Sequence, residues 1–187
     1  MEILYYIALI VWIIPAFRNY KTNLFVFFLL LAVHDPLSIL FKLLINPHLD
    51  LIYSVVITFL IILSLIRVKR KQILLICSIS AIILCYLAFI FLSVHTKMLI
   101  LMMQLVFVFL IILKKFAEYS IVNRAYNIFY IIVIFYLLTL ILKFLTVFIG
   151  SDYAIEYFII TTVFQILFGL FFSIFREDDP RLLVKFE

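Results

Sequence analysis

The chain has 187 residues, of which 69% are hydrophobic and only 13% are charged. A soluble domain carries roughly 45–50% apolar and about 25% charged residues, so a water-soluble core of this size cannot hide so much apolar surface. The net charge is +5, but the basic residues stand in short gaps between apolar runs. We therefore exclude a nucleic-acid-binding domain and expect the lipid bilayer to surround most of the chain.

Apolar runs divide the chain into seven predicted membrane-spanning helices. A span needs roughly 17–25 residues, so the ends of the shorter runs are expected to extend into their flanks. The predicted spans are Ile3–Phe17, Leu24–Ile45, Leu51–Ile66, Ile73–Val94, Met98–Leu113, Tyr126–Ile149 and Ile155–Phe175. The sequence thus predicts an all-α, seven-helix transmembrane domain over residues 1–175, followed by a short tail, residues 176–187.

Outside the predicted spans, the sequence predicts the structure of one long connection and of the C-terminal tail. The longest break between spans runs from Lys114 to Ala125 and is expected to be a loop. In the tail, Asp179 and Pro180 are residue types typical of an N-cap and a first helical residue. A short turn is expected to follow, with apolar side chains against lipid or against a partner protein. These side chains are Leu182, Leu183 and Phe186.

The basic residues outside the predicted spans lie almost entirely on one side of the predicted bundle. The other side carries only Lys97. The twelve on the basic side are Arg18, Lys21, Arg67, Lys69, Arg70, Lys71, Lys114, Lys115, Arg124, Arg176, Arg181 and Lys185. Because lysine and arginine accumulate in cytoplasmic loops, this bias predicts an outer N-terminus and a cytoplasmic C-terminus. That orientation requires an odd number of spans, as the seven apolar runs provide.

Three loose matches between the halves of the chain indicate an internal repeat. One pairs Asp50 with Asp152, which lie in the outer loops after the second and sixth predicted spans. A Phe-x-x-Tyr pattern that starts at Phe17, at the end of the first span, recurs at Phe116, after the fifth. Lys42 near the outer end of the second span has a counterpart in Lys143 of the sixth. These matches favour two parallel three-helix units joined by the fourth span, an architecture known among transporters. Chance similarity in a chain built from few residue types is the alternative.

The strongest functional signal is His34-Asp35-Pro36 in the second predicted span. Asp35 lies about 16 Å along the helix from Leu24, near the middle of the bilayer. A charged carboxylate there is costly without a partner, so an acid at this depth is a candidate functional residue. Pro36 removes a backbone donor and frees a carbonyl one turn earlier.

Other predicted spans carry polar side chains at compatible depths. Thr139 and Lys143 are one turn apart in the sixth span, Thr161 and Gln165 are one turn apart in the seventh, and Gln104 lies in the fifth. Such side chains are expected to converge on one polar cavity, with Asp35 paired to Lys42 or Lys143. The candidate ligand- or ion-binding set is His34, Asp35, Lys42, Thr139, Lys143 and Gln165.

A purely structural interpretation of these residues stays open. Lys42 and Lys143 can extend to the headgroups along their aliphatic stems, and Asp35 can be protonated or bonded to a neighbouring helix. His34 alone is more often an interior histidine with satisfied hydrogen bonds than a metal ligand.

The residues do not predict an enzyme. His34, His48 and His95 are scattered and have no metal-site spacing, so no metal is expected. The chain has no glycine-rich phosphate loop and no serine elbow, so no cofactor is expected. Asp35 is the only acid well inside a predicted span, whereas intramembrane hydrolases and transferases need several acids or histidines.

The segment Pro15-Ala16-Phe17-Arg18-Asn19-Tyr20, followed by a span with Asp35 and Pro36, resembles the first repeat of PQ-loop proteins. This superfamily includes SWEET sugar transporters, cystinosin and the KDEL receptor. The resemblance covers residues 8–45 and implies seven helices arranged as three, one and three. It also implies hinge roles for Pro15 and Pro36 and a binding role for Asp35. Ala16 departs from the family pattern, because it stands where the family has glutamine.

Two functional classes remain open from the sequence. The first is a transporter or ligand-binding receptor for a small polar solute that binds around Asp35. The second is a non-catalytic membrane subunit, sensor or scaffold that binds another membrane protein or a second copy of the chain. The abundance of Ile, Leu, Phe, Tyr and Lys is typical of AT-rich prokaryotic genomes, so we expect the prokaryotic cytoplasmic membrane as its location.

Overall fold

The computed structural model describes residues 2–44, 50–66, 92–150 and 154–185. Nearly all of them are helical, so the fold is all-α. The six α-helices within these ranges are α1 (Glu2–Arg18), α2 (Phe25–Leu44), α3 (Asp50–Leu65), α5 (Val94–Asn123), α6 (Ile128–Ile149) and α7 (Ala154–Ile174). The predicted fourth span lies outside the described residues except at its C-terminal end, which overlaps α5.

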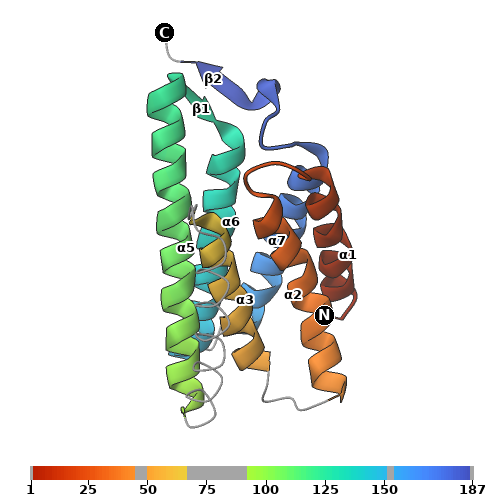
Figure 1. The fold of residues 1–187 in the computed structure, drawn as a ribbon. Coiled ribbons are helices and arrows are strands. Elements are labelled where there is room, and N and C mark those ends of the chain that lie inside the picture. The colour runs from red at the N-terminus through yellow and green to blue at the C-terminus, as the bar shows by residue number, and fades with distance from the viewer. Residues whose placement is uncertain (1, 45–49, 67–91, 151–153, 186–187) are drawn as a thin grey trace, which may run out of the picture.

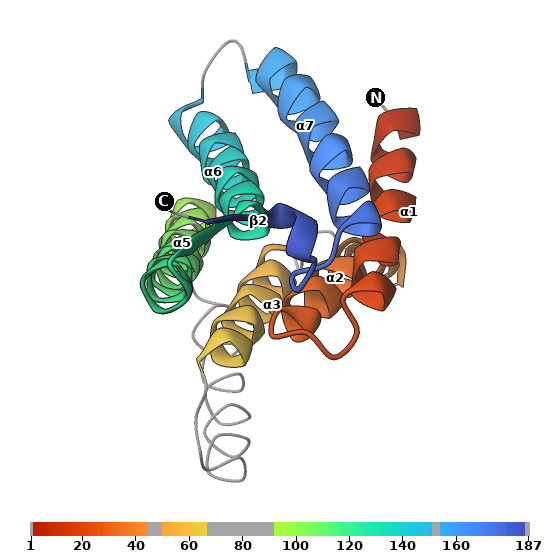
Figure 2. The same cartoon turned by 90° about the horizontal axis from the view of Figure 1, so that it is seen from above.

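The six described helices form a closed ring. Each packs against its neighbours in the order α1, α2, α3, α5, α6 and α7, and α7 returns to pack against α1. Figure 2 shows this ring from one end. The helices α1, α3, α5 and α7 run in one direction and α2 and α6 in the other (Figure 1). We call the end at which α1 and α7 finish the tail end, because the C-terminal tail lies there.

The helix α5 is longer than predicted, and the expected loop from Lys114 to Ala125 is wrong. The helix continues to Asn123 and stops at Arg124, whose φ of 48° is left-handed. No glycine or proline interrupts this segment, and Lys114 forms an i,i+4 ion pair with Glu118 at 3.7 Å. Hydropathy ended the predicted span at Leu113, but a polar segment with good helix formers continues the helix beyond it.

The C-terminal tail folds back onto the bundle. Strand β2 (Leu183–Lys185) pairs antiparallel with β1 (Ala125–Asn127), which joins α5 to α6. The tail therefore lies across the tail end of the ring, from α7 toward α5 (Figure 2). Asp179 caps a single 3₁₀ turn that begins at Pro180, as the sequence predicted. The expectation that Leu182 faces lipid or a partner is wrong, because it is 6% exposed and belongs to the core.

An aromatic cluster fills the ring toward the tail end. Phe28, Phe129 and Phe172 are completely buried and come from α2, α6 and α7. Their ring centroids lie 5.0 Å (Phe28–Phe172), 5.1 Å (Phe129–Phe172) and 5.9 Å (Phe28–Phe129) apart. Such tilted and edge-to-face pairs are favourable beyond their buried area. They join three helices that are far apart in the sequence.

One glycine allows α1 and α7 to approach closely. A Cβ placed on Gly169 would lie 2.7 Å from Val11 Cγ1 and 3.3 Å from Trp12 Nε1. Membrane helices commonly use small residues at such close contacts. Gly169 therefore seats Trp12 at the wall of the ring, where its indole lies 4.5 Å from the ring of Tyr136.

The outer face of the ring is apolar. Large hydrophobic side chains are widely exposed there, among them Ile10, Met103, Phe135, Ile149 and Leu167. Three helices, α5, α6 and α7, are long and apolar enough to cross a membrane. Apolar side chains exposed on several helices are costly in water but not in hydrocarbon. The structure is thus compatible with an integral membrane protein.

The matches that indicated a repeat occupy different environments where they can be compared. Phe17 is 78% exposed, whereas Phe116 packs against the core. Lys42 and Lys143 cannot be compared, because the side chain of Lys42 lies outside the described residues. The same holds for Asp50 and Asp152, since neither side chain lies within them.

Candidate functional site

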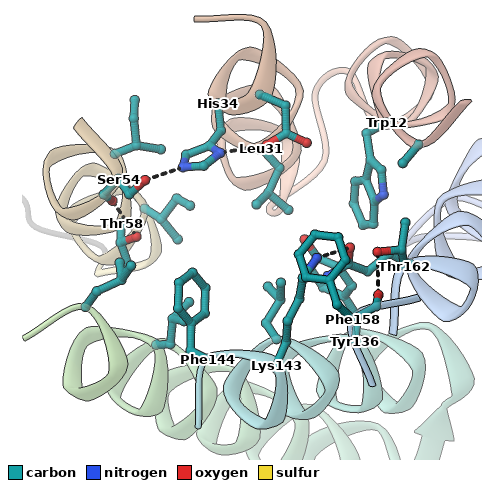
Figure 3. A pocket seen from close by; sticks show the side chains of 18 residues that line it. Trp12, Leu31, His34, Ser54, Thr58, Tyr136, Lys143, Phe144, Phe158 and Thr162 are labelled. Atoms are coloured by element: carbon teal, nitrogen blue, oxygen red, sulfur yellow. Dashed lines mark hydrogen bonds and ion pairs between the residues drawn. The ribbon is translucent and has the colours of Figure 1, made fainter. Parts of the chain in front are cut away.

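A cavity of about 190 Å³ lies inside the ring, and all six described helices line it. Its polar lining includes His34 and Asp35 of α2, Ser54 and Thr58 of α3, Lys143 of α6, and Thr162 and Gln165 of α7. Figure 3 shows these helices around an open space, with His34 on one side and Lys143 on the other. Four residues of the candidate binding set, His34, Asp35, Lys143 and Gln165, therefore line one cavity.

A chain of hydrogen bonds runs along the α2–α3 wall of the cavity. His34 Nδ1 lies 2.9 Å from Asp35 Oδ1, and His34 Nε2 lies 3.1 Å from Ser54 Oγ. On α3, the Thr58 hydroxyl donates to the Ser54 carbonyl at 2.8 Å. Asp35 thus orients the imidazole, and its second carboxylate oxygen has no hydrogen bond within the described residues. The side chain of Asp35 is 38% exposed.

Lys143 lies on the opposite wall and has weak protein partners. Its Nζ is 3.4 Å from Gln165 Oε1 and 3.9 Å from the centre of the Phe158 ring. A cation over an aromatic face is stabilised by the ring quadrupole, but this contact leaves most of its N–H donors unused. Within the part of the chain that the structure describes, no carboxylate pairs with Lys143, Asp35 included.

The rest of the cavity lining is apolar and aromatic. It includes Trp12, Leu31, Ile57, Leu105, Tyr136 and Phe144, with Tyr136 and Trp12 at the side of the aromatic cluster. Along α6 and α7 the cavity residues Lys143 and Gln165 lie farther from the tail end than Phe129 and Phe172. The aromatic cluster therefore separates the cavity from the tail end. Apolar walls with a few oriented polar groups are typical of a small-molecule site.

The remaining predicted site residues lie elsewhere. The Thr139 hydroxyl donates to the Tyr136 carbonyl at 2.7 Å, and Thr139 is not part of the cavity lining. Gln104 Oε1 is buried outside the cavity, without a hydrogen bond among the described residues. The side chain of Lys42 lies outside the described residues. Sequence reasoning paired Thr161 with Gln165, but the structure places Thr162 at the cavity.

The two predicted hinge prolines are inside helices. Pro15 is in the last turn but one of α1, and its carbonyl accepts hydrogen bonds from the backbone and side chain of Asn19. Pro36 lies within α2, next to Asp35. The structure shows one conformation, so their hinge roles stay predictions.

A second polar site, at the tail end, was not predicted. Glu177 is only 6% exposed, and its carboxylate accepts three hydrogen bonds. These come from the Leu24 backbone N–H at 2.9 Å, the Tyr130 hydroxyl at 2.6 Å and the Asn23 side-chain amide at 3.2 Å. Because Leu24 directly precedes α2, the carboxylate also lies at the positive end of that helix.

Two asparagines hold the backbone of Glu177. Its N–H donates to Asn19 Oδ1 at 3.2 Å, and its carbonyl accepts from Asn127 Nδ2 at 2.9 Å. Asn127 also caps α6 through its Oδ1. We call Asn19, Asn23, Asn127, Tyr130 and Glu177 the Glu177 network. Glu177 stands in the charged run Arg-Glu-Asp-Asp of the predicted tail, and no local pattern distinguished it.

No group of three or more His, Cys, Asp or Glu residues suited to a metal ion occurs within the described ranges. Comparisons of the chain with family models, with curated proteins and with solved structures found no match. Any functional inference therefore rests on the cavity, the Glu177 network and the arrangement of the helices.

Proposed function

We propose that the chain is a seven-span protein of a prokaryotic cytoplasmic membrane and that it binds a small polar solute inside the bundle, as a transporter or as a receptor. The N-terminus is outside and the tail end is cytoplasmic. The observation that carries the proposal is the cavity, which brings together His34, Asp35, Lys143 and Gln165 from three helices. The polar residues of the second and sixth predicted spans were separate features in the sequence. A shared cavity allows them to act together in binding one solute.

The directions of the helices support the proposed topology. α3 ends near Tyr119 and Tyr130 at the tail end, whereas α5 begins at the opposite end (Figure 1). The C-terminal end of α3 and the N-terminal end of α5 thus lie on opposite sides of the bundle. A chain of seven spans requires this, because one further span must connect them. The structure describes several basic residues of the predicted cytoplasmic side. All of them lie toward the tail end and outside the membrane interior. Cysteines placed at Lys97 or Lys185 in a background without Cys77 and Cys85 should react with an impermeant maleimide from opposite sides of the membrane.

The closed tail end supports binding from the opposite side. The aromatic cluster lies between the cavity and the tail end, and the folded tail lies across that end. In the proposed orientation the cavity therefore receives its solute from outside. A transporter must also open the aromatic cluster, whereas a receptor needs only to transmit a change in the ring.

The test is a binding screen with a matched pair of variants. The purified chain in lipid vesicles is offered labelled sugars, amino acids, carboxylates and amines. Thr162→Phe fills the cavity, while Val163→Phe adds the same ring at the next, outward-facing position, which is 42% exposed. We expect the wild type and Val163→Phe to bind one solute class and Thr162→Phe to lose at least about tenfold in affinity. Uptake into the vesicles then separates a transporter from a receptor. A chain that binds none of these classes contradicts the proposal.

A second candidate function is that of a membrane subunit that binds another protein or a second copy of the chain. Ile121 and Val122 favour it, because they are 78% and 79% exposed at the end of α5, beyond its most apolar part. Substituting both by serine should release a bound partner without changing the cavity. A chain that purifies as a monomer without a partner contradicts this alternative.

A further inference from the structure

We propose that the solute is a small zwitterion, which binds with its carboxylate at Lys143, its ammonium at Asp35 and its apolar part against the apolar lining. This inference rests on the proposed function, because it needs the cavity to be a solute site. It goes further by assigning the charge pattern of the solute. Three features of the cavity carry it.

The first feature is a cation without an anion. The Lys143 ammonium is held by a neutral amide oxygen at 3.4 Å and by the face of a phenyl ring. Neither contact neutralises its charge. A buried ammonium has a large desolvation cost that a carboxylate offsets better than a neutral acceptor does. An incoming carboxylate that lines up with Lys143 Nζ would supply the missing partner.

The second feature is a carboxylate with one oxygen available for a further hydrogen bond. Asp35 Oδ1 is bonded to His34, but Oδ2 has no partner within the described residues. His34 is itself tied to Ser54 on α3, so it holds the carboxylate in place and leaves one oxygen available. An ammonium donates to carboxylate oxygens through any of its N–H groups. Asp35 therefore suits the positive end of a solute.

The third feature is the separation of the two charges by an apolar space. α2 and α6 are not neighbours in the ring, and His34 and Lys143 face the space from opposite sides (Figure 3). The lining between them is mainly Trp12, Leu31, Ile57, Leu105, Tyr136 and Phe144. A cavity of about 150 Å³ holds benzene, so one of about 190 Å³ holds a solute slightly larger. That size suits a single small amino acid.

A solute with one charge fits less well. A simple carboxylate would pair with Lys143 but leave the Asp35 charge without a partner in the same cavity. A simple amine would leave Lys143 without an anion. A sugar would neutralise neither charge. Because the two charges on the walls are opposite, only a dipolar solute pairs both and keeps the occupied cavity neutral.

Matched solutes test this directly. Leucine is compared with 4-methylpentanoate, which lacks the ammonium, and with 3-methylbutylamine, which lacks the carboxylate. A second series compares 6-aminohexanoate with hexanoate and pentylamine. Its zwitterion has a larger distance between the two charges, and the two walls of the cavity determine which distance binds best. In one series at least, we expect the zwitterion to bind at least about tenfold more tightly than both of its single-charge analogues.

Two variants assign each end of the zwitterion. In Lys143→Met the advantage of the zwitterion over the amine should vanish, and in Asp35→Asn its advantage over the carboxylate should vanish. Thr139→Val is the control, because Thr139 is outside the cavity, and it should keep both advantages. Thermal unfolding of each variant in detergent verifies that it is folded.

The outcomes separate the two proposals. If a sugar or a single-charge solute binds, and Thr162→Phe blocks it while neither zwitterion is preferred, the zwitterion is excluded and the proposed function stands. If a zwitterion is preferred but both variants keep its advantage, the assignment of Lys143 and Asp35 is wrong. If no solute of any class binds, the proposed function itself fails.

Discussion

The chain buries polar side chains in two regions, the Glu177 network and the cavity, and they differ in how well those side chains are paired. In the Glu177 network, three donors meet the carboxylate, and two asparagines bind the backbone of the same residue. In the cavity, Lys143 has one long hydrogen bond to a neutral group, and one oxygen of Asp35 is free within the described residues.

The pairing of the polar side chains indicates the role of each region. A buried polar network whose groups are mutually satisfied fixes one arrangement of the chain. The Glu177 network connects the α1–α2 loop, the start of α6 and the tail, so it fixes how the tail closes its end of the ring. Charged groups that surround an open space and have few protein partners can bind a solute. We therefore interpret the first region as structural and propose the second as the binding site.

The largest expected effect is the loss of the Glu177 carboxylate. Glu177→Ala leaves the Leu24 N–H and the Tyr130 hydroxyl buried without their acceptor, which should cost about 3–4 kcal/mol of unfolding free energy. Unfolding in mixed detergent micelles measures it. Asp178→Ala is the control, because Asp178 is exposed and one residue away. Equal stability of the two variants would show that the Glu177 network does not hold the tail.

The Glu177 network also shows which features the sequence alone did not predict. The apolar runs predicted α6 and α7 to within two residues at each end, because hydropathy follows the surrounding solvent. They ended α5 too early, since a helix can leave the hydrocarbon and stay helical. Asp35 and Lys143 were found because a charge inside an apolar run is rare. Glu177 was missed because a charge in a charged tail is ordinary, and its burial depends on residues more than 150 positions away.

The next effect concerns the close contact between α1 and α7 at Gly169. Gly169→Val would force branched atoms against Val11 and Trp12, where even a Cβ lies 2.7 Å from Val11 Cγ1. Overpacking of this kind costs about 2 kcal/mol. Adding Val11→Ala makes room and should recover part of the loss in the same unfolding assay. If the double variant is no more stable than Gly169→Val alone, the contact between α1 and α7 is not the cause.

A smaller effect, of opposite sign, is expected in the cavity. Lys143→Met removes a half-buried cation that has no carboxylate partner among the described residues and replaces it with an apolar side chain of similar length. Its unfolding free energy should stay equal or rise by about 1 kcal/mol, while the preference for a zwitterion over the matching amine is lost. Measuring stability and binding on the same sample makes the comparison sharp. A clear loss of stability would mean that Lys143 is structural, like Glu177.

The smallest effect is local and depends on pH. Asp179 caps the 3₁₀ turn, and hydrogen bonds from the side chain and backbone of Arg181 lower the pKa of its carboxylate to about 2 from a usual 3.8. A lowered folded-state pKa means that the stabilisation is complete above about pH 4 and is lost as the pH falls through about 2. Amide exchange at Leu182, whose N–H donates to the Asp179 carbonyl at 3.1 Å, should therefore quicken, relative to unfolded peptide, only in that acid range. Arg181→Met should move the transition up toward pH 4. Because Leu182 belongs to the core, a transition that ignores Arg181 would mean that burial of Leu182, and not the ion pair, holds this turn against the ring.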